Sequence, residues 1–296
     1  MKGRNFLSAG DLTRAEAEHL LALARQLKSE PRGVQPLHRR VLAMVFEKPS
    51  LRTRVSFETG MVQLGGHAIY LAPQDIQLGK RESVADVARN LGRMADAIMA
   101  RVFRHETVAA LARWAGVPVI NGLSDLEHPC QGLADFLTIE EHCGLASKPV
   151  LAYIGDGNNV CHSLMLFARL FELDLRVGCP EGYAPLAALR EACPNVSIHH
   201  DPRAAVAGAQ VVYTDVWASM GQEDSAAERA QVFAPFQVDS ELMAAAAPEA
   251  RFMHCLPAHR GGEVTDEVLD GPQSIAFDQA ENRLHAQKAL LVALLG

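Results

Sequence analysis

Residues 41–54 read VLAMVFEKPSLRTR. The opening part, VLAMVF, is a short apolar run of the kind that forms a buried strand. After it, Phe57, Met61 and Leu64 recur at helical spacing, and a Gly-Gly pair at 65–66 is a typical helix end. The stretch thus predicts a strand that turns directly into a helix, which is the repeating unit of α/β proteins with parallel sheets.

Short apolar runs alternate with amphipathic segments through most of the chain. In the first half we expect strands at 41–46, 67–71, 97–102 and 117–120. In the second half we expect strands at 150–154, 175–178, 196–199, 211–214, 251–255 and 274–277. Helices are expected between them, including one near 131–143 that joins the halves and a last one near 279–294.

The length of 296 residues suggests two domains, at about 150 residues each. The predicted fold class is α/β, with two domains that are each a mostly parallel sheet with helices on both faces. We assign 1–143 together with 279–296 to one domain and 144–278 to the other. The active site is expected in the interdomain cleft, where the carboxyl ends of strands from both halves converge.

Composition excludes several classes of protein. With 28 basic and 35 acidic residues the net charge is −7, whereas a nucleic-acid-binding protein usually has a basic surplus. The apolar runs fall far short of the ~20 residues that span a bilayer, and no signal peptide is visible at the start. The six cysteines are scattered singly, so we expect a soluble cytoplasmic protein with free thiols.

The segment KPSLRTR at 48–54 has the features of an anion site. Ser50 is a good N-cap, the start of a helix leaves backbone N–H groups without acceptors, and Arg52 and Arg54 place two guanidinium groups beside them. The segment is not a Walker loop, so a nucleoside triphosphate is disfavoured. The alternative is a capped helix with two solvated arginines.

Two further segments carry polar groups at expected helix starts. His128 and Gln131 can donate hydrogen bonds to a carbonyl or amide, although an ordinary surface loop is the alternative, and zinc is not expected because no second ligand pair has the right spacing. The segment YIGDGNN at 153–159 is only half of a dinucleotide fingerprint. Asn158 and Asn159 instead offer amides suited to the carboxylate of an amino acid.

The last two segments follow strands in the second half. Asp215, with the Ser-Met-Gly sequence at 219–221, could grip an ammonium group, although such a carboxylate is more often a cap or turn residue. Cys255 places a thiol at the expected cleft. A dyad with His254 is not expected, because neighbouring strand residues point to opposite faces, and His259 beyond a proline is only a loose candidate.

Taken together, these motifs resemble those of the aspartate/ornithine carbamoyltransferase family, over a span from about Phe46 to Arg283. The matching segments, in chain order, are SLRTR at 50–54, HPCQ at 128–131, DVWASMG at 215–221 and HCLP at 254–257. The family has threonine where this chain has Leu51, a position expected to contribute mainly its backbone N–H. The family's aspartate branch has H-P-L-P at the last motif and lacks the Ser-Met-Gly loop.

The resemblance implies a reaction and a set of site residues. The expected reaction transfers the carbamoyl group of carbamoyl phosphate to the δ-amine of L-ornithine, giving L-citrulline and phosphate. The residues implied to bind carbamoyl phosphate are Ser50, Leu51, Arg52, Thr53, Gln77, Arg101, His128, Gln131, Cys255, Leu256 and Arg283. Those implied to bind ornithine are Asn159, Asp215, Ser219 and Met220, and those implied to act in catalysis are Cys255, Asp215, Arg101 and His128.

The resemblance also implies a homotrimer or a multiple of it, in which Gln77 often serves a neighbouring subunit's site, and it implies no metal or organic cofactor. Three alternatives remain open at this point. One is a carbamoyltransferase for a related amine such as N-acetylornithine or putrescine, and another is a non-catalytic ligand-binding relative. The third, a nicotinamide oxidoreductase, depends only on the GDGNN segment.

Overall fold

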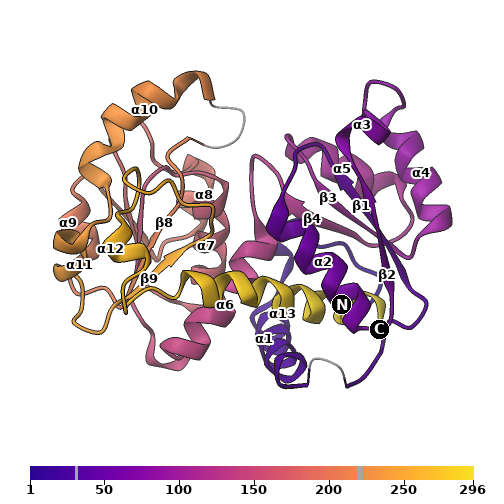
Figure 1. Ribbon diagram of the computed structural model, residues 1–296, viewed down its shortest axis with the longest axis horizontal. Coiled ribbons are helices and arrows are strands. Elements are labelled where there is room, and N and C mark those ends of the chain that lie inside the picture. The colour runs from indigo at the N-terminus through magenta and orange to yellow at the C-terminus, as the bar shows by residue number, and fades with distance from the viewer. Residues whose placement is uncertain (31–32, 219–222) are drawn as a thin grey trace. The chain divides into compact units, whose positions relative to one another are not determined.

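The computed structural model describes residues 1–30, 33–218 and 223–296 (Figure 1). The chain divides into two compact units. The first unit comprises Met1–Leu137 and Glu281–Gly296, and the second comprises Thr138–Ala280. Each unit contains one sheet whose strand pairs are all parallel, which confirms the α/β class with two parallel sheets.

The sheet of the first unit has the order β2-β1-β3-β4. Its strands are β1 (Val41–Phe46), β2 (His67–Leu71), β3 (Ala97–Arg101) and β4 (Val119–Leu123). The helices of this unit's first segment are α1 (Arg14–Ser29), α2 (Leu51–Gln63), α3 (Pro73–Ile76), α4 (Val84–Met94) and α5 (His105–Trp114), with a short 3₁₀ turn at Ala9–Asp11. Phe46 is in register with Arg101, so the loop after β1 and the end of β3 lie at the same edge of the sheet.

Both faces of this sheet are covered. Ala43 and Val45 of β1 pack in one apolar cluster with Val108 and Leu111 of α5. Met44, which points to the opposite face of the same strand, is also fully buried. Because alternate strand residues are buried on both sides, the sheet reads in the sequence as a continuous apolar run and not as an alternating one.

The sheet of the second unit has the order β7-β6-β5-β8-β9. Its strands are β5 (Leu151–Ile154), β6 (Leu175–Gly178), β7 (Val196–His199), β8 (Val211–Thr214) and β9 (Arg251–His254). Its helices are α7 (Asn159–Phe171), α8 (Ala187–Ala192), α9 (Pro202–Val206), α10 (Ala226–Phe233), α11 (Ser240–Ala244) and α12 (Asp266–Leu269), with 3₁₀ turns at Leu145–Ser147, Glu223–Ser225 and Ala234–Phe236.

Two long helices carry the chain from one unit into the other. They are α6 (Pro129–His142) and α13 (Ala276–Leu295), drawn in magenta and yellow in Figure 1. The division between the units falls within each of them, so most of α13 belongs to the first unit. Within that unit, the buried Lys288 of α13 donates to the Leu27 carbonyl at 3.0 Å and to Gln63 at 2.9 Å, which joins α13 to α1 and α2.

The structure departs most from the expected strands at two places. The predicted strand at 274–277 is wrong, because α13 already begins at Ala276, and only Ser274 forms a bridge, to Phe252. A four-residue apolar run such as SIAF does not distinguish a strand from the first turn of a helix. The strand expected at 117–120 begins later and continues through Asn121 to Leu123. None of the helices in the described ranges is long and apolar enough to cross a membrane.

Candidate active site

The start of α2 is organised around Ser50. This residue is the N-cap, and its hydroxyl accepts a hydrogen bond from the Thr53 N–H at 3.3 Å, as the sequence predicted. Arg52 is half-buried in the same first turn. Arg54 differs from the expectation of two guanidinium groups at the anion site, because it pairs with Glu58 at 3.0 Å and lies over the Tyr70 ring at 3.9 Å. Arg54 is therefore engaged at the surface of α2, which leaves Arg52 as the arginine of this segment with the predicted anion-binding role.

A buried network connects α13, α6 and α2. Arg283 donates to the Gln131 side chain at 2.7 Å and to the Thr53 hydroxyl at 3.3 Å. Gln131 in turn donates to Asp135 at 2.8 Å. These contacts bring together three of the predicted carbamoyl-phosphate residues from three separate helices. They meet at the N-terminal end of α2, where the helix dipole favours an anion.

His128 lies beside the same group of cations. Burial lowers the pKa of His128 well below its usual range, and the nearby charges of Arg283, Arg101, Lys48 and Arg52 lower it further. The imidazole is therefore neutral at neutral pH and can donate a hydrogen bond without a net charge. A neutral donor among several cations is suited to a phosphate joined to a carbonyl group.

Arg101 and Gln77 have different relations to this group. Arg101 is buried at the carboxyl end of β3, the position predicted from the sequence. Gln77 follows α3 with a left-handed φ of 48°. Within the described part of the chain, no side-chain hydrogen bond connects Gln77 to the cationic group, so its implied role stays a prediction.

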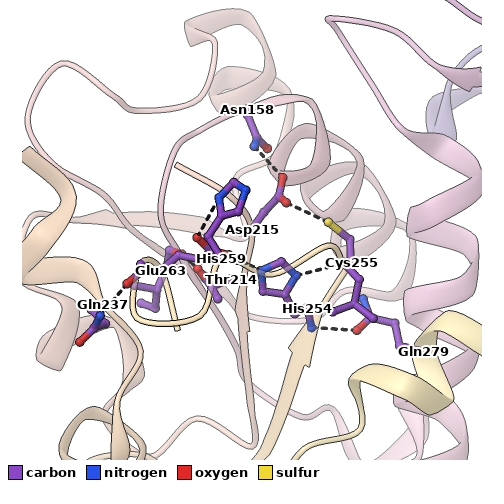
Figure 2. Close-up of polar contacts among 12 residues, drawn as sticks. Asn158, Thr214, Asp215, Gln237, His254, Cys255, His259, Glu263 and Gln279 are labelled. Atoms are coloured by element: carbon purple, nitrogen blue, oxygen red, sulfur yellow. Dashed lines mark hydrogen bonds and ion pairs between the residues drawn. The ribbon is translucent and has the colours of Figure 1, made fainter. Parts of the chain in front are cut away.

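The second unit holds a carboxylate and a thiol side by side (Figure 2). The neighbouring strands β8 and β9 are parallel, with Thr214 in register with His254. The next residue of each strand, Asp215 and Cys255, therefore leaves the sheet at the same edge. The Cys255 thiol donates to Asp215 Oδ1 at 2.9 Å, so the structure brings together these two predicted site residues.

Asn158 holds the other oxygen of that carboxylate. Its amide nitrogen donates to Asp215 Oδ2 at 2.9 Å, while its Oδ1 accepts from the Val160 and Cys161 N–H groups at 2.9 and 3.2 Å as the N-cap of α7. The amide that the sequence offered to a ligand's carboxylate is thus used inside the protein. Asn159, the first residue of α7, stays a candidate for that role.

His254 is the last residue of β9, whereas Cys255 lies just past the strand and not within it as expected. Ligand atoms of Asp215, His254 and Cys255 all lie within 4.8 Å of one another, because Cys255 lies just past the end of β9. However, His254 Nδ1 accepts from the Leu256 N–H at 2.8 Å, and Nε2 lies 3.0 Å from Glu263. Both ring nitrogens are engaged, so the ring is not available as a base for the thiol or as a ready metal ligand.

Sequence reasoning missed three residues around this site, namely Glu263, Asp156 and Arg229. Glu263, the partner of His254, lies in a loop without any periodic pattern that would indicate burial. Arg229 of α10 donates to the Asp156 carboxylate and to the Trp217 carbonyl, and it lies over the rings of Tyr183 and Phe233. The only signal for the Asp156–Arg229 pair was the GDGNN segment itself.

Ser219 and Met220, both predicted to bind ornithine, lie outside the described residues.

The structure is thus that of a two-domain α/β protein with one group of polar side chains in each unit. Family models place it further: the carbamoyl-P binding domain of aspartate/ornithine carbamoyltransferases matches residues 4–141, and the Asp/Orn binding domain matches residues 148–294. The chain belongs to the aspartate/ornithine carbamoyltransferase family.

Individual relatives cover the entire chain. The ornithine carbamoyltransferase of Anoxybacillus flavithermus is 53% identical over an alignment of 306 positions, which covers 100% of this chain and 98% of the relative. The anabolic ornithine carbamoyltransferase of Pseudomonas aeruginosa is 54% identical, over 100% of this chain and 98% of its own length. Among solved structures, the ornithine carbamoyltransferase of Pyrococcus furiosus superimposes with a TM-score of 0.95 at 51% identity, over 100% of this chain and 98% of that one.

Proposed function

We propose that the protein transfers the carbamoyl group of carbamoyl phosphate to the δ-amine of L-ornithine, giving L-citrulline and phosphate. The observation that carries the proposal is the Asp215–Cys255 pair, which suits an amine acceptor and not a dicarboxylate. The full-length relatives named ornithine carbamoyltransferase support the same reaction. The first unit binds the donor, and the second unit binds the acceptor.

In this proposal the start of α2 holds the phosphate. The backbone N–H groups of Ser50 and Leu51, together with the guanidinium of Arg52, neutralise the phosphate oxygens, and Arg101 adds a second fork. Thr53 and the neutral His128 donate to the carbamoyl oxygen, where negative charge develops during attack. Preorganised donors of this kind need no rearrangement as the charge grows.

The carbamoyl amide is oriented by Gln131, which Arg283 holds in place through its side-chain oxygen. The backbone carbonyl of Leu256 accepts from the same amide, by the resemblance to the family. Fixing two reactants in line can supply roughly 7–11 kcal/mol of the barrier in favourable cases. Orientation is therefore a large contribution of the site to the proposed reaction.

The acceptor must attack as a neutral amine, although an alkylamine titrates near 10.4 in water. The amine nitrogen forms a bond to the carbamoyl carbon, and the bond from that carbon to the phosphate oxygen breaks. The Cys255 thiol donates a hydrogen bond to the Asp215 carboxylate, and the pair takes the proton that the amine releases. Asn159, Ser219 and Met220 hold the α-amino and α-carboxylate groups of ornithine.

We also propose a homotrimer in which Gln77 completes a neighbouring subunit's site. In support, apolar side chains on the outer face of α2 and on the edge strand β2 are exposed: Leu51 by 73%, Val55 by 51%, Val62 by 65% and Ile69 by 44%. Light scattering should give three times the chain mass of 32.1 kDa, and Val62→Glu should lower it. A monomeric wild type would contradict this.

The cellular setting is a further part of the proposal. Arginine biosynthesis in the cytoplasm fits the anabolic Pseudomonas aeruginosa relative, and all six cysteines are free, as expected in a reducing compartment. The reaction itself is tested by supplying carbamoyl phosphate with ornithine, N-acetylornithine, putrescine or aspartate in parallel. Citrulline formed from ornithine at a rate well above the product of the other three supports the proposal. Preference for another acceptor, or ornithine binding without turnover, would refute it.

A further inference from the structure

Two buried ionisable side chains near the thiol have no role in the reaction proposed above. They are His254, which is 0% exposed, and Glu263, which is 1% exposed. Nε2 of the histidine lies 3.0 Å from Oε1 of the glutamate. A buried pair of this kind requires good hydrogen-bond geometry to offset its desolvation. The further contacts of both side chains therefore indicate what the pair holds in place.

The contact on the other side of the imidazole determines which tautomer the ring adopts. The backbone N–H of Leu256 donates to His254 Nδ1 at 2.8 Å, so Nδ1 acts as an acceptor and carries no proton. The proton of the neutral ring is then on Nε2, where it is donated to Glu263 (Figure 2). A carboxylate at Nε2 stabilises this tautomer and fixes the orientation of the ring.

Leu256 needs such a fixed partner. Its φ is 55°, in the left-handed region that a leucine rarely adopts. The residue directly before it is Cys255, whose thiol contacts Asp215. The hydrogen bond to His254 therefore holds the backbone between the thiol and the Leu256 carbonyl.

Glu263 is itself anchored on several sides. Its Oε1 also accepts from the His259 N–H at 2.6 Å, and its backbone carbonyl accepts from the Val238 N–H at 2.9 Å. Burial opposes ionisation of Glu263, but the hydrogen bonds from His254 and the His259 amide hold its pKa below the ordinary value. The loop from 255 to 263 thus closes on a carboxylate that is ionised at neutral pH.

We propose that Glu263 and His254 are positioning residues, which hold the Cys255 thiol and the Leu256 carbonyl in the geometry needed for carbamoyl transfer. The inference depends on the proposed function. It extends that function because two buried side chains, a carboxylate and an imidazole, then control turnover at the acceptor side of the site. They do so by holding other residues and not by contacting substrate.

Two substitutions of His254 distinguish the contribution of Nδ1 from that of Nε2. In His254→Asn the amide oxygen takes approximately the place of Nδ1 and can still accept from Leu256, whereas in His254→Gln the amide lies near Nε2 and loses that contact. We expect the asparagine variant to retain at least fivefold more kcat than the glutamine variant. A glutamine variant as active as the asparagine variant, or more so, would overturn the proposal.

Substitutions of Glu263 test the other link. In Glu263→Gln the amide oxygen can accept from both the imidazole and the His259 N–H, so kcat should stay within about threefold of wild type, whereas Glu263→Leu should lose roughly 10- to 100-fold. Binding of inorganic phosphate, measured by calorimetry, should be unchanged in both. The matched control is Glu267→Leu on the exposed face of α12, expected to behave as wild type.

Thiol labelling supplies a readout that does not require the proposed reaction. Iodoacetamide labelling followed by mass spectrometry should show a several-fold change at Cys255 in Glu263→Leu, with Cys143, the other half-buried cysteine, unchanged. Unaltered labelling together with unaltered kcat in that variant would refute the positioning role. A wild type that makes no citrulline while Cys255 labelling still responds to Glu263→Leu would instead refute the proposed function alone.

Discussion

The thiol of Cys255 donates a hydrogen bond to the carboxylate of Asp215, with Sγ 2.9 Å from Oδ1. The two residues are 40 positions apart in the chain and meet because β8 and β9 are parallel and in register up to Thr214 and His254. Each residue is the first one past its strand. The pair is therefore a consequence of sheet topology, and its chemistry can be tested by changing one partner at a time.

Removal of the thiol should affect turnover far more than donor binding. Cys255→Ala leaves Asp215 with its Asn158 contact but removes the thiol that donates to it, and general acid–base groups typically contribute roughly 10²–10⁴-fold. We expect a loss of kcat in that range, with protection against thermal unfolding by carbamoyl phosphate nearly unchanged. Cys255→Ser keeps a donor to Asp215, so its kcat should lie between those of wild type and the alanine variant. Wild-type kcat in the alanine variant would contradict the assignment.

Asn158 has two roles that substitution can separate. Asn158→Ser keeps an oxygen that can cap α7 but loses the donor to Asp215, whereas Asn158→Ala loses both. The alanine variant should lose about 0.5–2 kcal/mol of the free energy of unfolding, as other lost caps do. Both variants should show a KM for ornithine raised about tenfold, which corresponds to about 1.4 kcal/mol. Urea unfolding and initial rates measure the two effects, and a serine variant with an unaltered KM would separate Asn158 from substrate binding.

Arg52 and Arg54 form a matched pair on the same helical turn. Arg52→Ala should abolish detectable binding of inorganic phosphate while leaving the circular dichroism spectrum unchanged. Arg54→Ala should leave phosphate binding within about twofold, because Arg54 pairs with Glu58 at the surface, where such pairs contribute about 0.3–0.5 kcal/mol. Calorimetric titration with phosphate distinguishes them. Equal losses in the two variants would mean that the α2 segment acts only through its overall charge.

The stability of the protein should depend on pH through His128. Burial and the charges of Arg283 and Arg101 hold the pKa of His128 well below its usual range, so the unfolded chain binds this proton more readily than the folded one. The contribution to stability is therefore complete above about pH 6.5 and is lost as the pH falls from there toward the folded pKa.

His128→Gln removes that titration. The free energy of unfolding, measured by urea denaturation at steps from about pH 7.5 down to 5, should fall less steeply in the variant than in wild type. His285, whose pKa is also lowered by burial, is present in both proteins and cancels in the comparison. Parallel slopes in the two proteins would show that His128 is readily protonated in the folded state.

The positions of most strands followed from local sequence. The runs at 41–46, 67–71, 175–178, 196–199 and 211–214 form strands with the predicted bounds. Ser50 also caps α2 as predicted, because capping depends on a side chain and an N–H group three residues away. The predicted strand at 274–277 failed because so short a run carries too little periodicity to separate the two kinds of structure.

Local sequence also predicted which segments carry the chemistry, because strand-to-helix junctions with Ser50, His128 or Asp215 have recognisable residue types and spacing. What those side chains contact was decided by tertiary structure. Arg54 pairs with Glu58, and Asn158 donates a hydrogen bond to Asp215.

Glu263 became the buried partner of His254 without any local signal. Helix caps and strand periods involve neighbours in the chain, whereas hydrogen bonds among residues far apart depend on strand order, register and burial, which no single segment encodes.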